Sequence, residues 1–182
     1  TYSMAHKEQR DFCNSVKKQF PQFFHEKTVL DIGSGDVNGN NNQFFTDCFI
    51  LGNDIGFGPN VSMVCFAHEL PFVDGFFDTI ISTECFEHDR DYPKTLKAAI
   101  RMLKNGGLFV FSCATTGRPE HGTSRSKPYQ VFSTRVEGLE DYYKNLTEQD
   151  IKKELNLGEI FSEYSFSVDR EHCDLYFWGI KR

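Results

Sequence analysis

The chain has 182 residues, of which 39% are hydrophobic, and a formal net charge of −6 at pH 7. This length and apolar content suffice for one core and are short for two, so we expect a single domain over residues 1–182. The negative charge argues against a general nucleic-acid surface, because affinity for a polyanion comes mainly from Lys and Arg side chains on phosphates.

The cysteines and the apolar runs exclude further classes of protein. The six cysteines are scattered, with no C-x-x-C pair and no close Cys/His cluster, so we predict neither a metal site nor a disulfide framework. No apolar run approaches the roughly 20 residues of a membrane span, and the first residues lack the apolar core of a signal peptide. We therefore expect a cytoplasmic protein without a membrane span.

The first predicted element is an amphipathic helix over about residues 5–24. Apolar side chains recur there every three or four positions, at Phe12, Val16, Phe20 and Phe23. We expect this apolar stripe to lie on the main core.

Five β-rich runs follow, at residues 28–32, 48–54, 61–66, 77–82 and 108–113. Helix-like or glycine-rich segments separate several of them, and the clearest is a helix over residues 93–103. This alternation predicts a mainly parallel sheet that is covered by helices on both faces.

The last third of the chain has a different pattern. Thr147 is a predicted cap of a short helix to about Leu155, and residues 160–168 and 174–180 form two strands joined by a polar turn, hence an antiparallel hairpin. Residues 114–146, before them, form a long polar stretch. Loops of that length are usually functional lids or disordered, and we interpret this one as lid-like.

A glycine-rich turn follows the first predicted strand, in the stretch "VLDIGSGDVNGNNNQFF" at residues 29–45. A strand that feeds such a turn and then a helix suits close approach of the backbone to a ligand. Gly33-Ser34-Gly35 is a weak signal alone, but Asp54, about 20 residues on, can accept both hydroxyls of a ribose. This combination fits NAD and S-adenosylmethionine alike. The asparagines predict a lengthened start of the first helix after the turn, with Asn38 or Asn40 as its N-cap.

Charge helps to decide between the two cofactors. Asp31 and Asp36 flank the place where a pyrophosphate would lie, and like charges there are costly. S-adenosylmethionine has no phosphate and carries a sulfonium and an ammonium group, which acids can accommodate. The alternative is that the two aspartates only satisfy turn amides.

Several motifs together resemble the class I S-adenosylmethionine-dependent methyltransferases, and among them the small family with an "LPF…FD" signature. The matching stretches are "VLDIGSG" (29–35), "GNDIG" (52–56), "AHELPFVDGFFDTIIS" (67–82), "ECFEH" (84–88) and "RMLKNGGLFVFS" (101–112). The resemblance implies an α/β Rossmann-like fold, with a seven-stranded mainly parallel sheet, helices on both faces and a C-terminal antiparallel β-hairpin.

The resemblance also implies roles for individual residues. The expected cofactor contacts are Asp31, Gly33, Ser34 and Gly35 at the methionine part, Asp54 at the ribose, Ile55, Ala67 and His68 around adenine, and Ser82 near the transferring methyl group. Glu84, just past the fourth strand, is expected on the substrate side. Two positions depart from the pattern: Val37 replaces the third glycine, and Phe66 stands where an acid often binds the adenine amino group.

Candidates for chemistry and substrate binding follow the fourth and fifth strands. His88 is a candidate general base, with a structural histidine as the alternative, and His121 is a second base candidate. Residues 115–135 carry a surplus of three positive charges, which suggests that Arg118 grips a phosphate or carboxylate, while Tyr129 could wall the pocket. The alternative is a solvated loop whose charges only keep it soluble.

The leading hypothesis is an S-adenosylmethionine-dependent methyltransferase that acts on an oxygen or nitrogen of a small, anionic acceptor such as a sugar or sugar nucleotide. One alternative is a catalytically degenerate methyltransferase fold that serves as a binding subunit, suggested by Val37, Phe66 and the asparagine run. A second is an NAD-dependent oxidoreductase, which conflicts with the flanking aspartates and the terminal hairpin.

Overall fold

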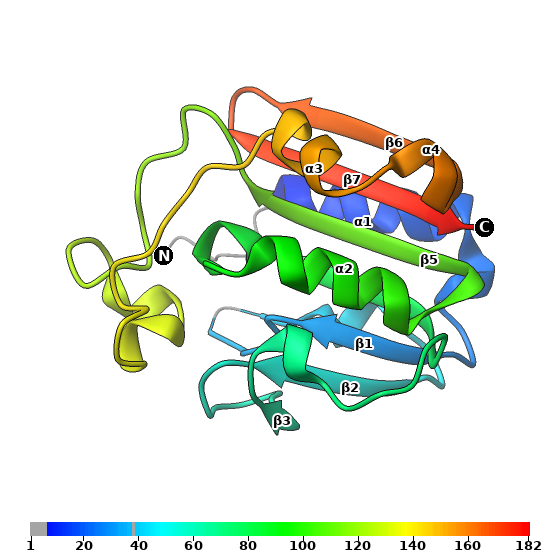
Figure 1. The fold of residues 1–182 in the computed structure, drawn as a ribbon, viewed down its shortest axis with the longest axis horizontal. Coiled ribbons are helices and arrows are strands. Elements are labelled where there is room, and N and C mark those ends of the chain that lie inside the picture. The colour runs from blue at the N-terminus through cyan, green and yellow to red at the C-terminus, as the bar shows by residue number, and fades with distance from the viewer. Residues whose placement is uncertain (1–6, 38) are drawn as a thin grey trace.

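The computed structural model describes residues 7–37 and 39–182, and its centre is one seven-stranded sheet with the order β3-β2-β1-β4-β5-β7-β6 (Figure 1). The strands are β1 (Thr28–Ile32), β2 (Phe49–Asp54), β3 (Met63–Val64), β4 (Phe77–Thr83), β5 (Leu103–Ala114), β6 (Phe161–Asp169) and β7 (Asp174–Lys181). The first five strands pair in parallel, and β7 lies antiparallel between β5 and β6. The predicted fold, including the C-terminal hairpin, is confirmed.

The central strands are apolar because both of their faces are covered. Val29 and Leu30 on β1, and Ile80 and Ile81 on β4, are each 0% exposed although neighbouring residues point to opposite faces. Burial on both sides explains why these runs lack the apolar and polar alternation of a strand with one wet face. The third run shortens most, from the predicted residues 61–66 to Met63–Val64 at the edge of the sheet.

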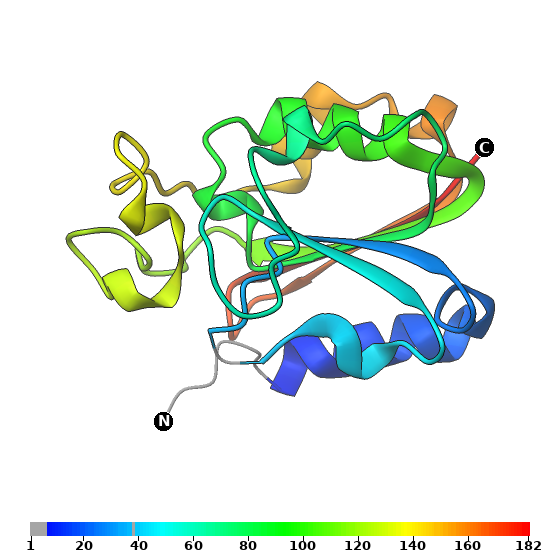
Figure 2. The ribbon, with the colours of Figure 1, turned by 90° about the horizontal axis from the view of Figure 1, so that it is seen from below.

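Helices cover the two faces unequally (Figure 2). One face carries α1 (Lys7–Gln19) and the 3-10 helices η1 (Pro21–Phe23) and η2 (Asn41–Phe44); the other carries α2 (Tyr92–Met102), α3 (Glu148–Glu154), α4 (Leu157–Ile160) and η3 (Ala67–Glu69). The apolar stripe of α1 packs in the smaller of the two apolar clusters, with Val16 buried and Phe12 half-buried, and not on the larger cluster as the expectation of a main core implied. Residues 5 and 6 of the predicted helix lie outside the described residues.

The connection from β1 to β2 corrects one expectation. Among the described residues between the glycine turn and β2 there is no α-helix, and the chain makes the single 3-10 turn η2 there. Asn40 is its N-cap, and the Asn40 side chain accepts a hydrogen bond from the backbone N–H of Asn42. The other predicted cap, Asn38, lies outside the described residues. A full helix is unnecessary here because α1, which precedes β1, already covers this face with Cys13 and Val16.

The lid, which we define as residues 114–146, extends past the carboxyl ends of the parallel strands (Figure 1). It contains two short 3-10 helices, η5 (Pro128–Gln130) and η6 (Ser133–Arg135). Phe132 and Leu139 are each only 5% exposed, so this segment packs against the rest of the molecule and is not a freely solvated loop.

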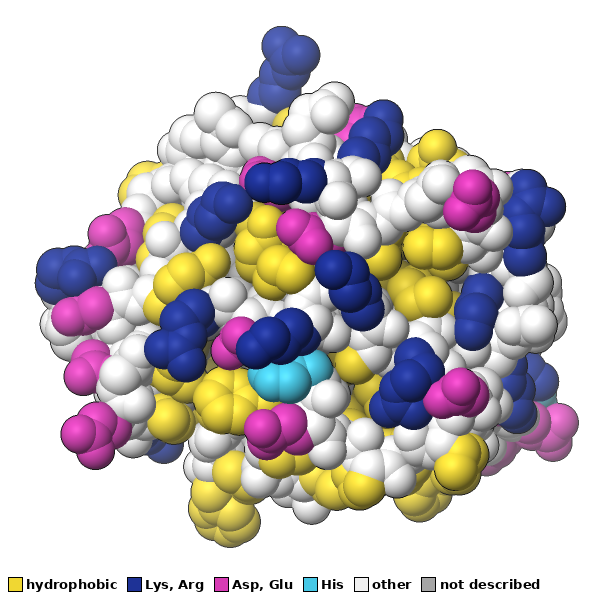
Figure 3. Space-filling view, viewed as in Figure 1, with side chains coloured by type: hydrophobic (Ala, Val, Ile, Leu, Met, Phe, Trp, Pro, Cys, Tyr) yellow, Lys and Arg dark blue, Asp and Glu magenta, His cyan; other side chains and the backbone are white. Residues whose placement is uncertain are grey.

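The surface agrees with the composition. On the face shown in Figure 3, Lys and Arg side chains are interspersed with Asp and Glu and form no continuous basic area. Within residues 7–37 and 39–182, no helix has both the length and the apolar character that crossing a membrane requires.

The capping box of α3 gives a test of local stability. The Thr147 hydroxyl accepts from the Asp150 backbone N–H, and the Asp150 carboxylate accepts from the Thr147 N–H at 2.9 Å. We expect Thr147→Ala to lower the free energy of unfolding by about 1 kcal/mol in urea denaturation, because an N–H donor at the helix start loses its acceptor.

The matched control is Thr147→Ser, which keeps the hydroxyl and should unfold within a few tenths of a kcal/mol of the parent. Equal destabilisation by both substitutions would instead assign the effect to packing of the threonine methyl group.

Candidate active site

A pocket opens at the carboxyl edge of the sheet, where the glycine turn, the end of β2, the segment after β4 and the lid meet. Nine of the residues expected from the sequence line it: Asp31, Gly33, Ser34, Gly35, Asp54, Ile55, Ala67, Glu84 and His88. Five others, His68, Ser82, Arg118, His121 and Tyr129, are not among its lining residues. The sequence therefore predicted most of the lining residues that come from the glycine turn and the end of β2, and fewer of those that come from the lid.

The glycine turn has the conformation that its residues predict. Gly33 has a φ of +76°, and a Cβ there would lie 2.5 Å from the Cys85 sulfur, so only glycine fits. Its N–H donates to the carbonyl of Asn53 at 2.8 Å, which ties the turn to the end of β2. The backbone can thus approach a ligand closely at this point.

Asp54 is held at the end of β2 by backbone donors. Its Oδ2 accepts from the Gly35 N–H at 3.0 Å, and its Oδ1 accepts from the Ile55 N–H at 2.7 Å. A carboxylate oxygen can accept a further hydrogen bond, so both oxygens keep capacity for a ligand's hydroxyl groups.

Asp31 is completely buried beside the same turn. Its Oδ1 accepts from the Asn41 amide at 2.9 Å, whereas its Oδ2 has no hydrogen-bond partner among the described residues. Burial raises the pKa of Asp31 to about 7, although the Asn41 hydrogen bond opposes the shift. An uncompensated carboxyl that lines a pocket is suited to a cationic ligand group.

Asp36, the second aspartate beside the glycine turn, accepts hydrogen bonds from the amides of the turn. Its carboxylate accepts from the Gly39 N–H at 2.8 Å and from the Asn40 side-chain amide at 2.7 Å. Asp36 therefore satisfies the amides of the turn, as the alternative interpretation expects, and is not among the residues that line the pocket.

Phe132 of the lid is a pocket residue that the sequence reading missed. A Cβ at Gly35 or at Gly58 would lie 2.3 Å from the Phe132 ring, and a Cβ at Gly56 would lie 2.5 Å from the Phe132 Cβ. The Phe132 side chain thus packs directly against the backbone of three glycines, where any larger residue would collide with it. Two of these glycines, Gly56 and Gly58, stand in the stretch "DIGFG" at the end of β2 and could have indicated a close contact there. No local pattern shows that the contacting residue, Phe132, is about 75 positions later in the chain.

The part of the pocket that the sequence motifs predict for adenine is apolar. Phe66 and Ala67 line it, and Phe66 stacks on His68 with ring centroids 5.4 Å apart. His68 thus lies behind Phe66 and not at the cavity surface. Ser82 also does not line the pocket, because it is 0% exposed and its hydroxyl donates to the Ile32 carbonyl at 2.9 Å. This hydrogen bond links β4 to β1, and the next residue, Thr83, lines the pocket instead.

Arg118 does not have the environment expected of an anion-gripping residue. Its guanidinium donates to the Asp174 carboxylate and to the His172 carbonyl, both at 2.8 Å, and lies 3.9 Å from Glu84. These contacts engage the positive charge within the protein, and they fix the lid to β7. Tyr129, 65% exposed, also lies away from the pocket lining.

Glu84 stands between the pocket and this ion pair. It has a φ of +50°, and its Oε1 accepts from the Ser112 hydroxyl at 3.0 Å. Burial raises the pKa of Glu84 well above its ordinary value, and the carboxyls of Glu87 and Asp174 add to the shift. Acidic groups therefore crowd the far side of the pocket as well.

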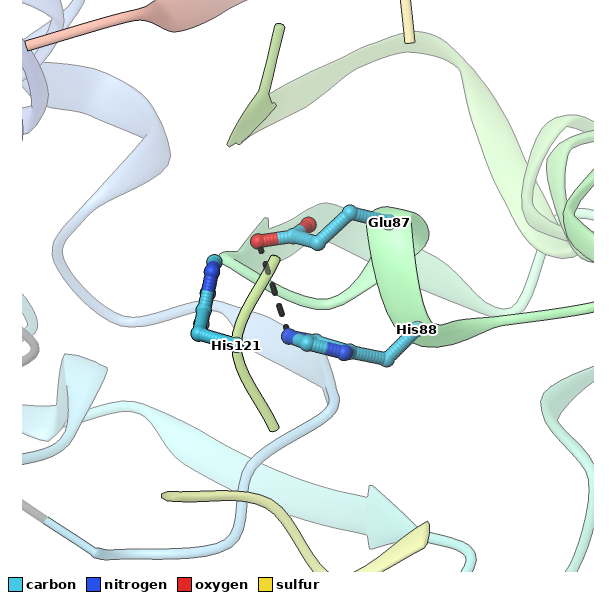
Figure 4. A group of neighbouring side chains, drawn as sticks. All are labelled: Glu87, His88 and His121. Atoms are coloured by element: carbon cyan, nitrogen blue, oxygen red, sulfur yellow. Dashed lines mark ion pairs between the residues drawn. The ribbon is translucent and has the colours of Figure 1, made fainter. Parts of the chain in front are cut away.

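His88, His121 and Glu87, which the sequence did not single out, lie close together (Figure 4). His88 and His121 have ring centroids 5.0 Å apart, and Nε2 of His88 is 3.9 Å from Oε1 of Glu87. Burial lowers the pKa of His88 to about 3, with His121 and Arg118 adding to the shift, so His88 is neutral and a weak proton acceptor. Burial raises the pKa of Glu87 to about 7.

Comparison with known proteins agrees with this arrangement. A family model described as a methyltransferase domain matches residues 4–175. The structure is similar to 1,6-didemethyltoxoflavin-N1-methyltransferase of Burkholderia thailandensis, solved with bound S-adenosylhomocysteine, with a TM-score of 0.66, 16% identity, and coverage of 96% of this chain and 78% of that one.

Two further relatives are N-methyltransferases. Phosphoethanolamine N-methyltransferase 2 of Haemonchus contortus, in complex with S-adenosyl-L-methionine, superimposes with a TM-score of 0.62 at 16% identity, over 94% of this chain and 52% of that one. Sarcosine/dimethylglycine N-methyltransferase of Halorhodospira halochloris is 39% identical over 44 residues, which are 24% of this chain and only 16% of that enzyme.

The family match extends over nearly the whole sheet, and the fold is the one that the sequence motifs imply. The narrower "LPF…FD" assignment stays a prediction. The chain therefore belongs to the methyltransferase domain family, and the resemblance to methyltransferases is confirmed at that level.

Proposed function

We propose that this methyltransferase transfers a methyl group from S-adenosylmethionine to an oxygen or nitrogen of a small acceptor that binds in the same pocket, beside Glu84 and His88. The observation that carries the proposal is a single cavity with the glycine turn and Asp54 on one side and Glu84, His88 and the lid on the other. Methyl transfer from a sulfonium is an in-line displacement, so the enzyme chiefly has to align the two reactants and exclude water.

The donor side supports the placement of each part of the cofactor. The ammonium group of its methionine part fits the unpartnered Oδ2 of Asp31, and the ribose hydroxyls fit the two oriented oxygens of Asp54. Ile55, Phe66 and Ala67 offer an apolar surface to adenine. A pyrophosphate would instead meet the buried carboxyl of Asp31, which disfavours NAD.

The acceptor side supports a nucleophile that needs little help from a base. A hydroxyl must lose a proton during transfer, whereas a neutral amine attacks without prior deprotonation. His88 lines the pocket, but its low pKa makes it a weak general base, and His121 lies behind it. We infer that these histidines shape the acceptor site and do not carry the proton in the methyl-transfer step.

An anionic acceptor, such as a sugar nucleotide, would have to use cations other than Arg118. Arg90 lines the pocket, and its side chain is 53% exposed at 3.9 Å from Asp91, so it can reorient toward an acceptor's phosphate or carboxylate. The direct test is incubation with S-adenosylmethionine and a panel of sugar nucleotides and small amines, with detection of the methylated product by mass spectrometry. Tight cofactor binding without any methylated product from a broad panel would favour a degenerate binding subunit.

The ribose assignment predicts the effect of Asp54→Ala. Loss of hydrogen bonds between a carboxylate and the ribose should weaken S-adenosylhomocysteine binding by roughly 10-fold to 100-fold in calorimetric titration. Asp47→Ala, at an exposed acid outside the pocket, is the matched control and should bind as the parent does. Unchanged affinity in Asp54→Ala would remove Asp54 from the cofactor site.

The buried carboxyl of Asp31 predicts a pH dependence of cofactor binding. A cation binds the charged carboxylate, so below a pKa of about 7 the group must first lose its proton, and affinity should fall by up to about tenfold per pH unit between pH 7 and pH 5. In Asp31→Asn, which keeps an oxygen for the Asn41 hydrogen bond, affinity should be lower at pH 7 and nearly flat over this range. An identical pH slope in parent and variant would place the titration on another group.

A further inference from the structure

The cluster of Glu87, His88 and His121 joins two parts of the chain that are distant in sequence. Glu87 and His88 belong to the 3-10 helix η4 (Phe86–His88) that follows β4, and His121 comes from the lid. One nitrogen or oxygen of each residue lies within 4.8 Å of the others, and the three side chains converge on one point (Figure 4). Glu87 is 0% exposed and each histidine is 7% exposed, so the cluster is inside the protein.

Two members of the cluster have unused polar atoms. Both carboxylate oxygens of Glu87 and both ring nitrogens of His88 lack a partner at full hydrogen-bond geometry among the described residues, although the backbone N–H groups of Glu87 and Ala114 lie near enough to the Glu87 carboxylate to lower its pKa. A buried polar group without a partner costs about 1–3 kcal/mol, and more when it is charged, so native proteins seldom leave several together. Four such atoms on two adjacent residues point to a ligand that binds between them.

His121 is oriented by a backbone carbonyl. Its Nδ1 lies 3.1 Å from the carbonyl oxygen of Pro119, and donation of the Nδ1 hydrogen leaves the lone pair on Nε2. Metal-binding histidines commonly donate their second ring N–H in this way, which fixes the tautomer and the plane of the ring.

The surrounding charges favour a cation. Glu84, Glu87 and Asp174 are three buried carboxyls, and the partly buried guanidinium of Arg118 pairs with Asp174 and lies 3.9 Å from Glu84. Three carboxylates and one guanidinium leave two negative charges that protons or a cation must balance. A dication would balance both.

We propose that Glu87, His88 and His121 bind one divalent transition-metal ion of the zinc or ferrous class, in contrast to the metal-free protein expected from the sequence. Two imidazoles and one carboxylate are a ligand set that such ions accept, with at least one coordination position left open. Because His88 also lines the methyl-transfer pocket, the proposed ion would lie next to the acceptor site.

The distances agree with a site that closes slightly on the ion. Two atoms bound at about 2.1 Å to one tetrahedral ion are about 3.4 Å apart. The 3.9 Å between Glu87 and His88, and separations of up to 4.8 Å among the three ligand atoms, therefore require side-chain shifts below about 1 Å. The bound ion would link the lid to the end of β4.

The test is a metal titration that does not depend on methyl transfer. Untagged full-length protein, freed of metal by a chelator, is titrated with Zn²⁺ against a chromophoric chelator and, separately, with Co²⁺ in the spectrophotometer. We expect one equivalent of Zn²⁺ to bind with an affinity tighter than about 1 μM and to raise the melting temperature. The Co²⁺ spectrum should lack a thiolate charge-transfer band, because no cysteine belongs to the site.

The variants Glu87→Gln, His88→Asn and His121→Asn should each weaken Zn²⁺ binding by at least about 100-fold, the upper end of the loss caused by an outer partner of a ligand. His25→Asn, at a half-exposed histidine elsewhere, is the matched control and should bind as the parent does. Circular dichroism checks that each variant is folded. If a variant does not fold, the Zn²⁺ titration of the parent protein still tests the proposal.

Three results would overturn the site: no stoichiometric binding by the parent, unchanged affinity in folded variants, or a thiolate band with Co²⁺. Since none of these readouts uses S-adenosylmethionine, failure of the metal site and failure of the proposed reaction can be told apart.

Discussion

Parallel pairing of β1 with both β2 and β4 is the constraint on which the whole site depends. The register aligns Asp31 with Gly52 on one side and with Ile81 on the other, so the three strands end nearly together. The residues that follow each strand therefore meet at one edge of the sheet, which is where ligands of parallel α/β folds bind. The glycine turn, Asp54 and Glu84 reach one pocket for this reason, although up to about 50 residues separate them in the chain.

The same edge concentrates carboxyl groups in a poorly hydrated space. Asp31 approaches the cofactor side, whereas Glu84 and Glu87 crowd the opposite side, and burial raises the pKa of each. Such an arrangement is costly in the empty protein and is stabilised by positive charge. The positive charge of the proposed cofactor would balance the Asp31 carboxylate. The proposed divalent metal ion would balance the carboxylates near Glu87.

The lid completes the pocket by supplying side chains that the sheet lacks. Phe132 packs on three glycines near the end of β2, and His121 reaches the residues that follow β4. The ion pair between Arg118 and Asp174 anchors the start of the lid to β7. The residues that hold the lid in place are therefore different from the residues that it adds to the site.

The sequence by itself determined the strands, the terminal hairpin, the glycine turn and the position of Asp54, because these depend on apolar runs and on turn residues that act within a few positions. Only the tertiary structure decided that the described residues after the glycine turn form a 3-10 turn and no α-helix, since α1 already covers that face of the sheet. It also decided the surroundings of Arg118 and Glu87. The partner of Arg118 is 56 positions away, and Glu87 meets His121 through the lid, so no local pattern could show that these residues come together.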